Sequence, residues 1–306
     1  MRVFLTRRIL LLVPTLLGVT LATFLMLHLT PGDPVTIMLG EFASTADAAR
    51  LRAELGLDRP LVVQYLKFLG RVIRGDLGDS IRSHRSVAEE IADRLPPTME
   101  LALAAQVLAV GLGVAAGVTA AAARHPAVDS AIVAISLVGL SMPTFWSGLL
   151  LILLFSLTLG WLPITASGGL RALLLPAVTL AAPAAAVLAR ITRASVLEVL
   201  RHDYVRTARA KGVSERLVVY HHALRNALIP IVTVAGLQFA GLVAGAVIVE
   251  SVFSRPGLGR LAVNAILARD FPLAQGIVLI VAALYVFVNV GVDILYGILD
   301  PRIRYQ

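Results

Sequence analysis

Cysteine is absent from this chain, and charge is scarce. Only 15% of its 306 residues are Asp, Glu, Lys or Arg, whereas 58% are hydrophobic and the mean hydropathy is +0.85. The lack of cysteine excludes disulfides, thiolate metal sites and a cysteine nucleophile. Soluble domains carry about 25% charged residues, so this composition indicates a membrane protein.

Motifs for nucleotide binding and hydrolysis are also missing. Neither lysine, Lys67 nor Lys211, closes a G-x-x-x-x-G-K-[ST] phosphate-binding loop, and no H-E-x-x-H or G-x-S-x-G sequence occurs. His221 and His222 are adjacent, so on a helix they point about 100° apart and cannot chelate one metal ion together. We therefore predict no catalytic, cofactor-binding or metal-binding residue in this chain, and no enzymatic activity.

Six apolar segments are long enough to cross a bilayer, which takes about 20 helical residues. The first follows a basic start but is too long for a signal peptide and lacks a cleavage site, so it is interpreted as an uncleaved span. The third is interrupted at Ser141-Met142-Pro143. The fold class predicted is an all-α polytopic membrane protein with six transmembrane helices, at about 9–29, 98–123, 129–157, 172–197, 227–249 and 273–299.

The distribution of basic residues orients these spans. With the N-terminus in the cytoplasm, the inner segments 1–8, 124–128, 190–226 and 299–306 hold fourteen of the 27 Lys and Arg residues. Nine others lie in the long segment 30–96, which is long enough to escape the positive-inside rule. The rule therefore predicts that both termini lie in the cytoplasm, and it accounts for the net charge of +8 without nucleic acid.

Three regions follow from this topology. Residues 1–29 form the cytoplasmic N-terminus and the first span, 30–96 an extracytoplasmic helical insertion, and 97–306 a five-helix core. Within the insertion, one amphipathic helix is predicted to begin at Ser44. A second begins after Asp58, with Pro60 in its first turn, and ends at Gly75. Its apolar positions at helical spacing are Val62, Leu66, Leu69 and Ile73.

Charge within the spans is limited to their ends. Glu250 lies at the outer end of the fifth span and Asp293 near the inner end of the sixth, where tilt or snorkelling brings each to an interface. Since no carboxylate is placed at the bilayer centre, an ion-coupled carrier is disfavoured. Uncharged polar residues within the spans, Gln106 among them, can line a path for a polar solute, and any one of them can instead hydrogen-bond between helices. The candidate translocation residues are Ser136, Ser141, Gln238 and Asn289.

A basic stretch, DYVRTARAKGVSERLVVYHHALRNALIP at 203–230, separates two apolar spans. Asp203 can cap a short helix that Gly212 ends, and Ser214 can cap a second helix that continues into the fifth span. Its predicted apolar face holds Leu217, Tyr220 or His221, Leu224 and Leu228. The pattern predicts a helix–glycine–helix elbow in the cytoplasm; an ordinary basic loop on anionic lipid is the alternative.

This stretch resembles the cytoplasmic signature loop of ABC importer permeases, E-A-A-x3-G-x9-I-x-L-P. Ala208 and Gly212 match that motif, whereas Arg206, Thr207, His222 and Arg225 depart from it. The version here is similar to the peptide and nickel subgroup, and the similarity covers essentially the whole chain. It includes LTPGDP at 29–34, GDLGDS at 75–80, RLPPTMELAL at 94–103, ESVFSRPGLG at 250–259 and DPRIRY at 300–305.

The resemblance implies a type I ABC importer-like permease in the bacterial plasma (inner) membrane. Its partners would be a second, homologous permease, two ATPase subunits that bind ATP and magnesium, an extracytoplasmic solute-binding protein and membrane lipid. Dipeptides, oligopeptides, glutathione and nickel chelates are all possible substrates. The coupling loop would be about 198–228, with contacts at Asp203, Arg206, Ala208, Arg209, Lys211 and Gly212.

The loop at 250–272 is the candidate outer gate, on account of its turn-forming residues beside an acid: Glu250, Pro256, Gly257 and Gly259. Two other classes of function remain as alternatives. A stand-alone channel or ion-coupled secondary transporter would need a continuous pore or an internal coupling group. An intramembrane enzyme would need convergent His, Asp, Glu or Ser residues within the spans, and the sequence offers no such set.

Overall fold

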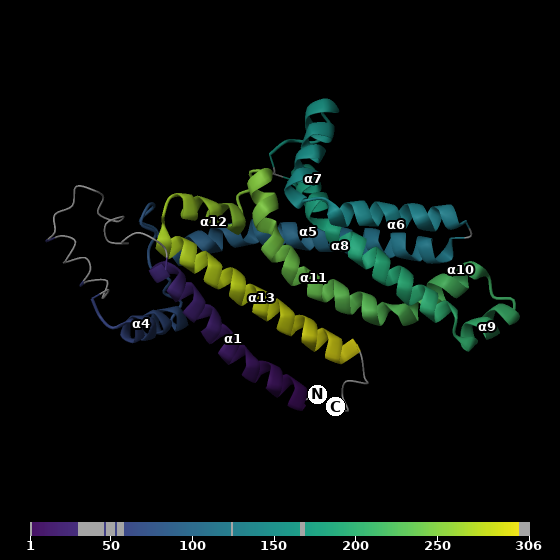
Figure 1. Ribbon diagram of the computed structural model, residues 1–306, viewed down its shortest axis with the longest axis horizontal. Helices are drawn as coiled ribbons and strands as arrows, with labels where there is room; N and C mark the ends of the chain where they lie inside the picture. The colour runs from purple at the N-terminus through teal and green to yellow at the C-terminus, as the bar shows by residue number, and fades with distance from the viewer. Residues whose placement is uncertain are drawn as a thin grey trace.

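The computed structural model describes residues 2–29, 46, 53, 58–123, 125–165 and 169–299, which form helices and turns without a β-strand (Figure 1). The helix predicted from Ser44 and the DPRIRY ending lie outside the described residues, as does the side chain of Asp293. The helices are α1 (Arg2–Leu29), α4 (Leu61–Ile73), α5 (Val87–Ala122), α6 (Pro126–Ser141), α7 (Thr144–Leu151), η1 (Ile152–Thr158), α8 (Gly169–Leu200), α9 (Asp203–Ala210), α10 (Glu215–Leu217), η2 (Val218–Ala223), α11 (Leu224–Val252), α12 (Leu258–Leu267) and α13 (Phe271–Leu299).

Four stretches are long and apolar enough to cross a membrane: α5, α8, the continuous run Glu215–Val252, and α13. A fifth is added if α6 and the following helix Thr144–Thr158, bent by 107° from each other, count as one broken span. The apolar part of α1, Leu10–Met26, is shorter than the 18 residues taken as the minimum for a membrane span. An all-helical membrane fold is therefore confirmed, and the sixth span stays a prediction.

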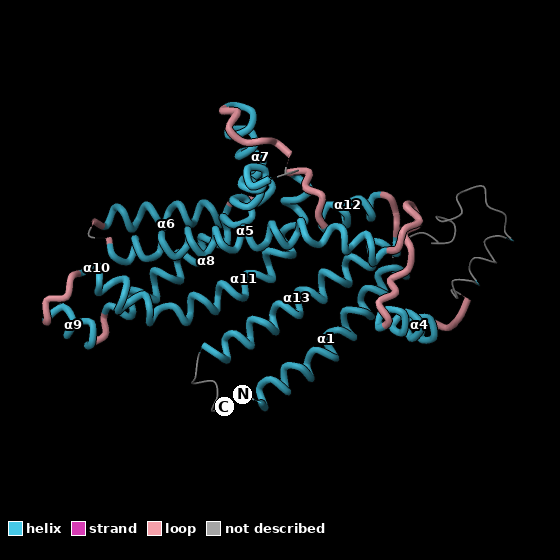
Figure 2. The backbone as a smooth tube through the Cα atoms, turned by 180° about the vertical axis from the view of Figure 1, so that it is seen from behind, coloured by secondary structure: helices cyan, strands magenta, loops and turns pink. Residues whose placement is uncertain are grey.

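The bend between α6 and α7 occurs at the interruption that the sequence predicts. Met142 has extended backbone angles, φ −77° and ψ 130°, and Pro143 comes just before the first residue of α7. A residue that precedes proline is sterically driven out of the helical region, so α6 ends where it does. The π-helical segment η1 then continues α7 away from the rest of the bundle (Figures 1 and 2).

The core is built on the close packing of α5 against α8. A Cβ atom added at Gly117 would lie 2.5 Å from both the Ala189 carbonyl oxygen and the Thr192 Cβ, and one at Gly113 would lie 2.7 Å from the Leu188 Cβ. Small residues four apart allow this approach, which in a membrane supplies the van der Waals contact that holds helices together. The buried cluster around this contact extends into α11, through Ile231 and Ala235.

Different short helices lie at the two ends of the bundle. The turn from α9 to α10 lies at one end, together with the connection from α5 to α6, whereas α4 and α12 lie at the opposite end (Figures 1 and 2). Helices α1 and α13 run side by side. The helix α5 begins at Val87, so the predicted domain boundary between residues 96 and 97 falls inside a continuous helix.

The helix α4 confirms the predicted element, but it packs through a different face. Tyr65 and Phe68 contact Phe24 of α1, with ring centroids 5.5 and 5.9 Å apart. The predicted stripe is largely exposed: Val62 by 70%, Leu66 by 59% and Ile73 by 77%. The periodicity correctly indicated that α4 has an apolar face. The residues that contact α1, however, are Tyr65 and Phe68, which lie beside the predicted stripe.

Alanine substitutions at two glycines of α5 test the close packing. We expect Gly117→Ala to destabilise the protein by about 1–3 kcal/mol, because its Cβ would overlap α8. Gly111→Ala is the matched control, since nothing lies within 4 Å of its added Cβ, and it should be neutral or slightly stabilising. Thermal unfolding in detergent measures both, and equal melting temperatures for the two variants would contradict the packing described.

Candidate functional site

The elbow predicted around Gly212 is present, and its turn is a Schellman motif. The Val213 N–H donates to the Ala208 carbonyl at 3.2 Å, and the Gly212 N–H donates to the Arg209 carbonyl at 2.9 Å. Gly212 has φ +77°, in the left-handed region that costs other L-residues about 1–2 kcal/mol. The sequence therefore predicts both the position and the reason for this break correctly.

Side-chain contacts fix the geometry of the elbow. Val205 and Val218 are fully buried on its inner side. Across the turn, Arg209 makes a bidentate ion pair with Glu215, with Nε–Oε2 and Nη2–Oε1 distances of 3.1 and 2.6 Å. Hydrogen bonding to Glu215 raises the pKa of Arg209 above its already high value. The two short helices are thus held at a set angle.

A second contact joins the elbow to α11. The Asn226 side-chain amide donates to the Tyr204 hydroxyl at 2.8 Å and to the His222 carbonyl at 2.8 Å. The proposed cap at Asp203 is wrong in detail, because His202 occupies the N-cap position and no side-chain cap bond forms. Asp203 instead pairs with Arg206 at 3.4 Å on the surface.

The exposed surface of the elbow is polar and mostly basic. Asp203, Arg206, Lys211 and Gly212 are exposed, Arg209 lies mostly at the surface, and Ala208 is half-buried. The predicted apolar face of the second helix is wrong by about one position, since Leu217 and Tyr220 are exposed whereas Val218 and Val219 are buried. The π-helical turn η2 has more residues per turn than an α-helix, which displaces the face read at α-helical spacing.

At the opposite end, the buried carboxylate of Glu250 ties three helices together. Its Oε1 accepts from the Thr98 hydroxyl of α5 at 2.6 Å, and its Oε2 accepts from the Gly259 N–H of α12 at 2.7 Å. The Thr98 hydroxyl oxygen in turn accepts from the Leu258 N–H at 2.8 Å. Glu250 has no exposed surface, so its carboxylate is held inside the protein and does not snorkel to solvent.

The remaining gate residues close around this carboxylate. A Cβ at Gly257 would lie 2.1 Å from the Glu250 Oε1, and one at Gly259 would lie 2.2 Å from the Val247 Cα. Arg255, which is 5% exposed, donates to the Pro97 carbonyl at 3.1 Å and pairs with Glu100 at 2.5 Å. The turn at 253–257, between α11 and α12, is therefore fastened to α5, and Pro256 lines a cavity beside it.

The candidate translocation residues do not form one cluster. Ser136 and Ser141 lie on α6, which packs against α5 and α8, and the Ser136 hydroxyl donates to the Ile132 carbonyl of its own helix at 2.8 Å. Gln238 of α11 donates to the Ala184 carbonyl of α8 at 3.3 Å. Asn289 lies on α13, partly buried. Gln106 of α5 similarly donates to the Ala235 carbonyl at 3.0 Å, so both glutamines hydrogen-bond between helices.

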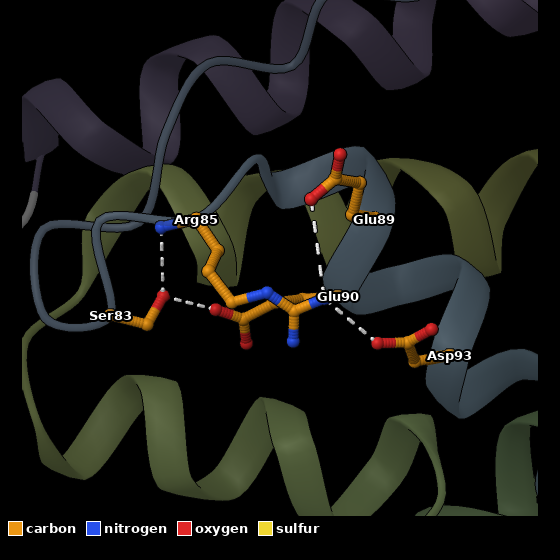
Figure 3. A network of polar contacts seen from close by, with 5 residues as sticks. All are labelled: Ser83, Arg85, Glu89, Glu90 and Asp93. Atoms are coloured by element: carbon orange, nitrogen blue, oxygen red, sulfur yellow. Dashed lines mark hydrogen bonds and ion pairs between the residues drawn. The ribbon is translucent and has the colours of Figure 1, made fainter.

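Several polar residues at the α12 end were not predicted. Asp270, 2% exposed, accepts from the Ser80 hydroxyl at 2.5 Å and fastens the turn before α5 to the start of α13. Figure 3 shows a network beside that turn, in which Arg85 pairs with Asp93 at 3.0 Å and the Ser83 hydroxyl donates to Glu90. The quoted motifs GDLGDS and RLPPTMELAL contain Ser80 and Thr98, but motifs do not show which distant residues they meet.

No group of three or more His, Asp or Glu side chains suited to a metal ion occurs in the part of the chain that the structure describes. Its buried polar groups instead join helices, as Glu250 and Asp270 do. An exposed elbow at one end and a fastened turn at the other suit a membrane subunit that works with other proteins.

Comparison with known families agrees with this. Residues 113–305 match the family model of the binding-protein-dependent transport system inner membrane component, and residues 1–102 match the N-terminal model of such membrane components. The chain belongs to this family. It is a multi-pass permease of the bacterial inner membrane, within the peptide-importer family of ABC transporters.

Individual relatives cover the whole length. The chain is 46% identical to a di/tripeptide transport system permease of Pseudomonas aeruginosa, over 99% of both chains. It is 45% identical to a glutathione transport system permease of Salmonella paratyphi A, over 99% of both, and to a putative peptide transport system permease of Brucella abortus, over 100% of both. The inward-facing MetNI methionine ABC transporter shares the fold, with a TM-score of 0.53 and 20% identity over 70% of this chain and 94% of that one.

The Glu250 cluster can be tested by removing one hydroxyl. Thr98→Val leaves both the Glu250 Oε1 and the Leu258 N–H without this partner, so we expect a loss of stability of about 1–3 kcal/mol for each unpaired group. Thr119→Val is the control, because that exposed hydroxyl bonds only to the Ala115 carbonyl of its own helix. The melting temperature in detergent measures both effects. A Thr98→Val variant that melts at the same temperature as the wild type and the Thr119→Val control would refute the role of the cluster.

Proposed function

We propose that this chain forms half of the translocation pathway of an ATP-driven importer for di- or oligopeptides or a related small solute. The observation that carries the proposal is the elbow: an exposed basic turn, fixed by Arg209 and Glu215, that continues into a membrane-spanning helix without interruption. Such an arrangement passes a displacement at the turn directly to the membrane helices. The peptide substrate is inferred from relatives that are named as di/tripeptide, peptide and glutathione permeases.

The proposed topology has six spans, with both termini in the cytoplasm. The α9–α10 end then faces the cytoplasm, and α4, α12 and the insertion at 30–96 lie outside. The positive-inside count supports this orientation, and so does the arrangement of the elbow and α12 at opposite ends (Figure 1). α1 supplies the first span and the broken α6–α7 stretch the third.

The chain works in a complex. Its partners are a second, homologous permease, two cytoplasmic ATPases and an extracytoplasmic solute-binding protein. ATP and magnesium bind to the ATPases and no cofactor binds to this chain, which is in line with its lack of a phosphate-binding loop. The elbow residues Asp203, Arg206, Ala208, Arg209, Lys211 and Gly212 form the surface that an ATPase receives.

The outer end supplies the gate. Glu250 and its hydrogen bonds hold Gly257 and Gly259 against α5, so opening on that side requires either that α12 moves together with α5 and α11 or that these bonds break. Ser136, Ser141, Gln238 and Asn289 remain the candidate pathway residues. To contact solute, the Gln238 side chain would have to break its hydrogen bond to the Ala184 carbonyl of α8.

The substrate class is tested by uptake into proteoliposomes. We expect the complete importer, with its binding protein and ATP, to accumulate radiolabelled dialanine, whereas liposomes with this permease pair but no ATPases should not. ATP without the binding protein is the second control. Flux through the permease pair without ATPases would favour a channel or carrier instead.

The coupling role is tested at the outward face of the elbow. Ala210 is exposed and has no packing role, so Ala210→Trp should fold normally yet obstruct an ATPase groove, and we expect uptake to fall at least about tenfold. Gly212→Pro should also abolish uptake. Ala92→Trp, an equally exposed change on α5 at the other end, is the matched control. Normal uptake and normal solute-stimulated ATP hydrolysis in Ala210→Trp would refute the coupling surface.

A further inference from the structure

Two adjoining cavities lie between the start of α5 and α12. The smaller, of about 250 Å³, is lined by Arg94, Arg260 and Asn264 and by the turn at Pro256 and Gly257. The larger, of about 510 Å³, shares Leu261 and Asn264 with it and extends past Glu90 to the turn before α5. Together they form a groove, which we call the α5–α12 groove, beside the segment that Glu250 fastens.

The two halves of the groove carry opposite charge. The smaller cavity has two guanidinium groups, Arg94 and Arg260, and no carboxylate. The larger has two carboxylates, Glu90 and Asp270, and one guanidinium, Arg82, so its net charge is negative. Asp270 is buried and already accepts bonds from the turn before α5, which leaves Glu90 as the accessible acid.

The charged groups of the groove have unused hydrogen-bonding capacity. Within the described residues, the Arg94 guanidinium has neither a hydrogen bond nor an ion pair, and the Arg260 guanidinium uses only Nη1, which donates to the Ser254 carbonyl at 2.6 Å. Glu90 engages Oε1 with Ser83 and leaves Oε2 for another donor (Figure 3). Glu90 and Arg94 are four residues apart on one helix, a spacing at which opposite charges usually pair, yet no ion pair joins them here.

The spacing of Glu90 and Arg94 along α5 is comparable to the length of a short peptide. Four residues of α-helix rise by about 6 Å, which separates the α-carbons of these two residues along the helix axis. The ammonium and carboxylate of an extended dipeptide are at most about 7 Å apart, and those of a tripeptide about 10 Å, at roughly 3.3–3.6 Å per residue. A cavity of 510 Å³ also lies within the range of about 300–1,000 Å³ usual for small ligands.

We propose that the α5–α12 groove is a binding site for zwitterionic di- and tripeptides, with Arg94 and Arg260 on the terminal carboxylate, Glu90 on the terminal ammonium and the Asn264 amide on the peptide backbone. This inference rests on the proposed peptide-import function. It identifies the two charged termini of the peptide as the groups that this chain recognises. The groove reads the two termini and their spacing, and its open sides leave the side chains unselected. It limits peptide length through this permease as well as through the binding protein.

The test uses the complete importer in proteoliposomes with radiolabelled dialanine. Arg94→Gln, Arg260→Gln and Glu90→Gln each replace a charged side chain by a neutral polar one, and Glu90→Gln also keeps its size. Uptake should fall about tenfold or more in each. Arg74→Gln is the control, because this exposed residue at the end of α4 lines neither cavity. Saturation-transfer NMR on the complex without binding protein should detect dialanine but not dialanine amide, and should lose the dialanine signal in Arg94→Gln.

Docking of the peptide-free binding protein is measured in parallel to separate a peptide site from a protein-docking surface. Unchanged docking with reduced uptake supports the peptide site, whereas docking that weakens as much as uptake overturns it. Uptake within about twofold of wild type in all three variants also overturns it and leaves the peptide-import function intact. Failure of the wild-type importer to accumulate any di- or tripeptide would overturn both.

Discussion

The buried carboxylate of Glu250 is the interaction on which the α12 end depends. Desolvating a carboxylate is costly unless its oxygens are hydrogen-bonded, and here donors come from Thr98 of α5 and from the first N–H groups of α12. The same carboxylate thus holds α5, α11 and α12 in register and stabilises the start of α12, where the backbone amides carry partial positive charge. These bonds also hold the turn between α11 and α12 beside the α5–α12 groove.

One helical stretch joins that cluster to the elbow. Residues Glu215–Val252 run from the ion pair with Arg209 to the carboxylate of Glu250 without a break in helical structure. At the middle of the bundle, this stretch packs against α5 and α8, whose own contact is held close by Gly113 and Gly117. The proposed partners at the two ends therefore act on the same element, and no separate relay has to be invoked.

Local sequence predicted the features that depend on neighbouring residues. The glycine turn at Gly212, the bend before Pro143 and the presence of α4 follow from backbone sterics and periodicity, and each is present, although Pro60 is the N-cap of α4 and not part of its first turn. The family also followed from motifs spread along the whole chain. The predictions that failed concern contacts between residues far apart in the sequence. The burial of Glu250 requires Thr98, more than a hundred residues away, and no periodic pattern connects the two.

Face assignments failed for a related reason. The stripe on α4 was placed correctly as apolar, but only the contact with Phe24 decides which edge is covered. On the second elbow helix, the π-helical turn η2 changes the angle between successive side chains, so α-helical spacing misplaces the buried positions. The candidate pathway residues were chosen by polarity alone, and polarity also serves helix pairing, as Gln238 shows.

The length of the stretch Glu215–Val252 has a mechanical consequence. It contains 38 residues, which at about 1.5 Å each extend roughly 55 Å, more than the 40–45 Å of a bilayer with its headgroups. Set upright in a bilayer, a stretch of this length is about 10–15 Å longer than the membrane is thick. Tilting an element of this length by about 5° displaces one end relative to the other by about 5 Å, close to one helical turn. A small change in the tilt of this stretch is therefore enough to move the elbow by the width of a side chain.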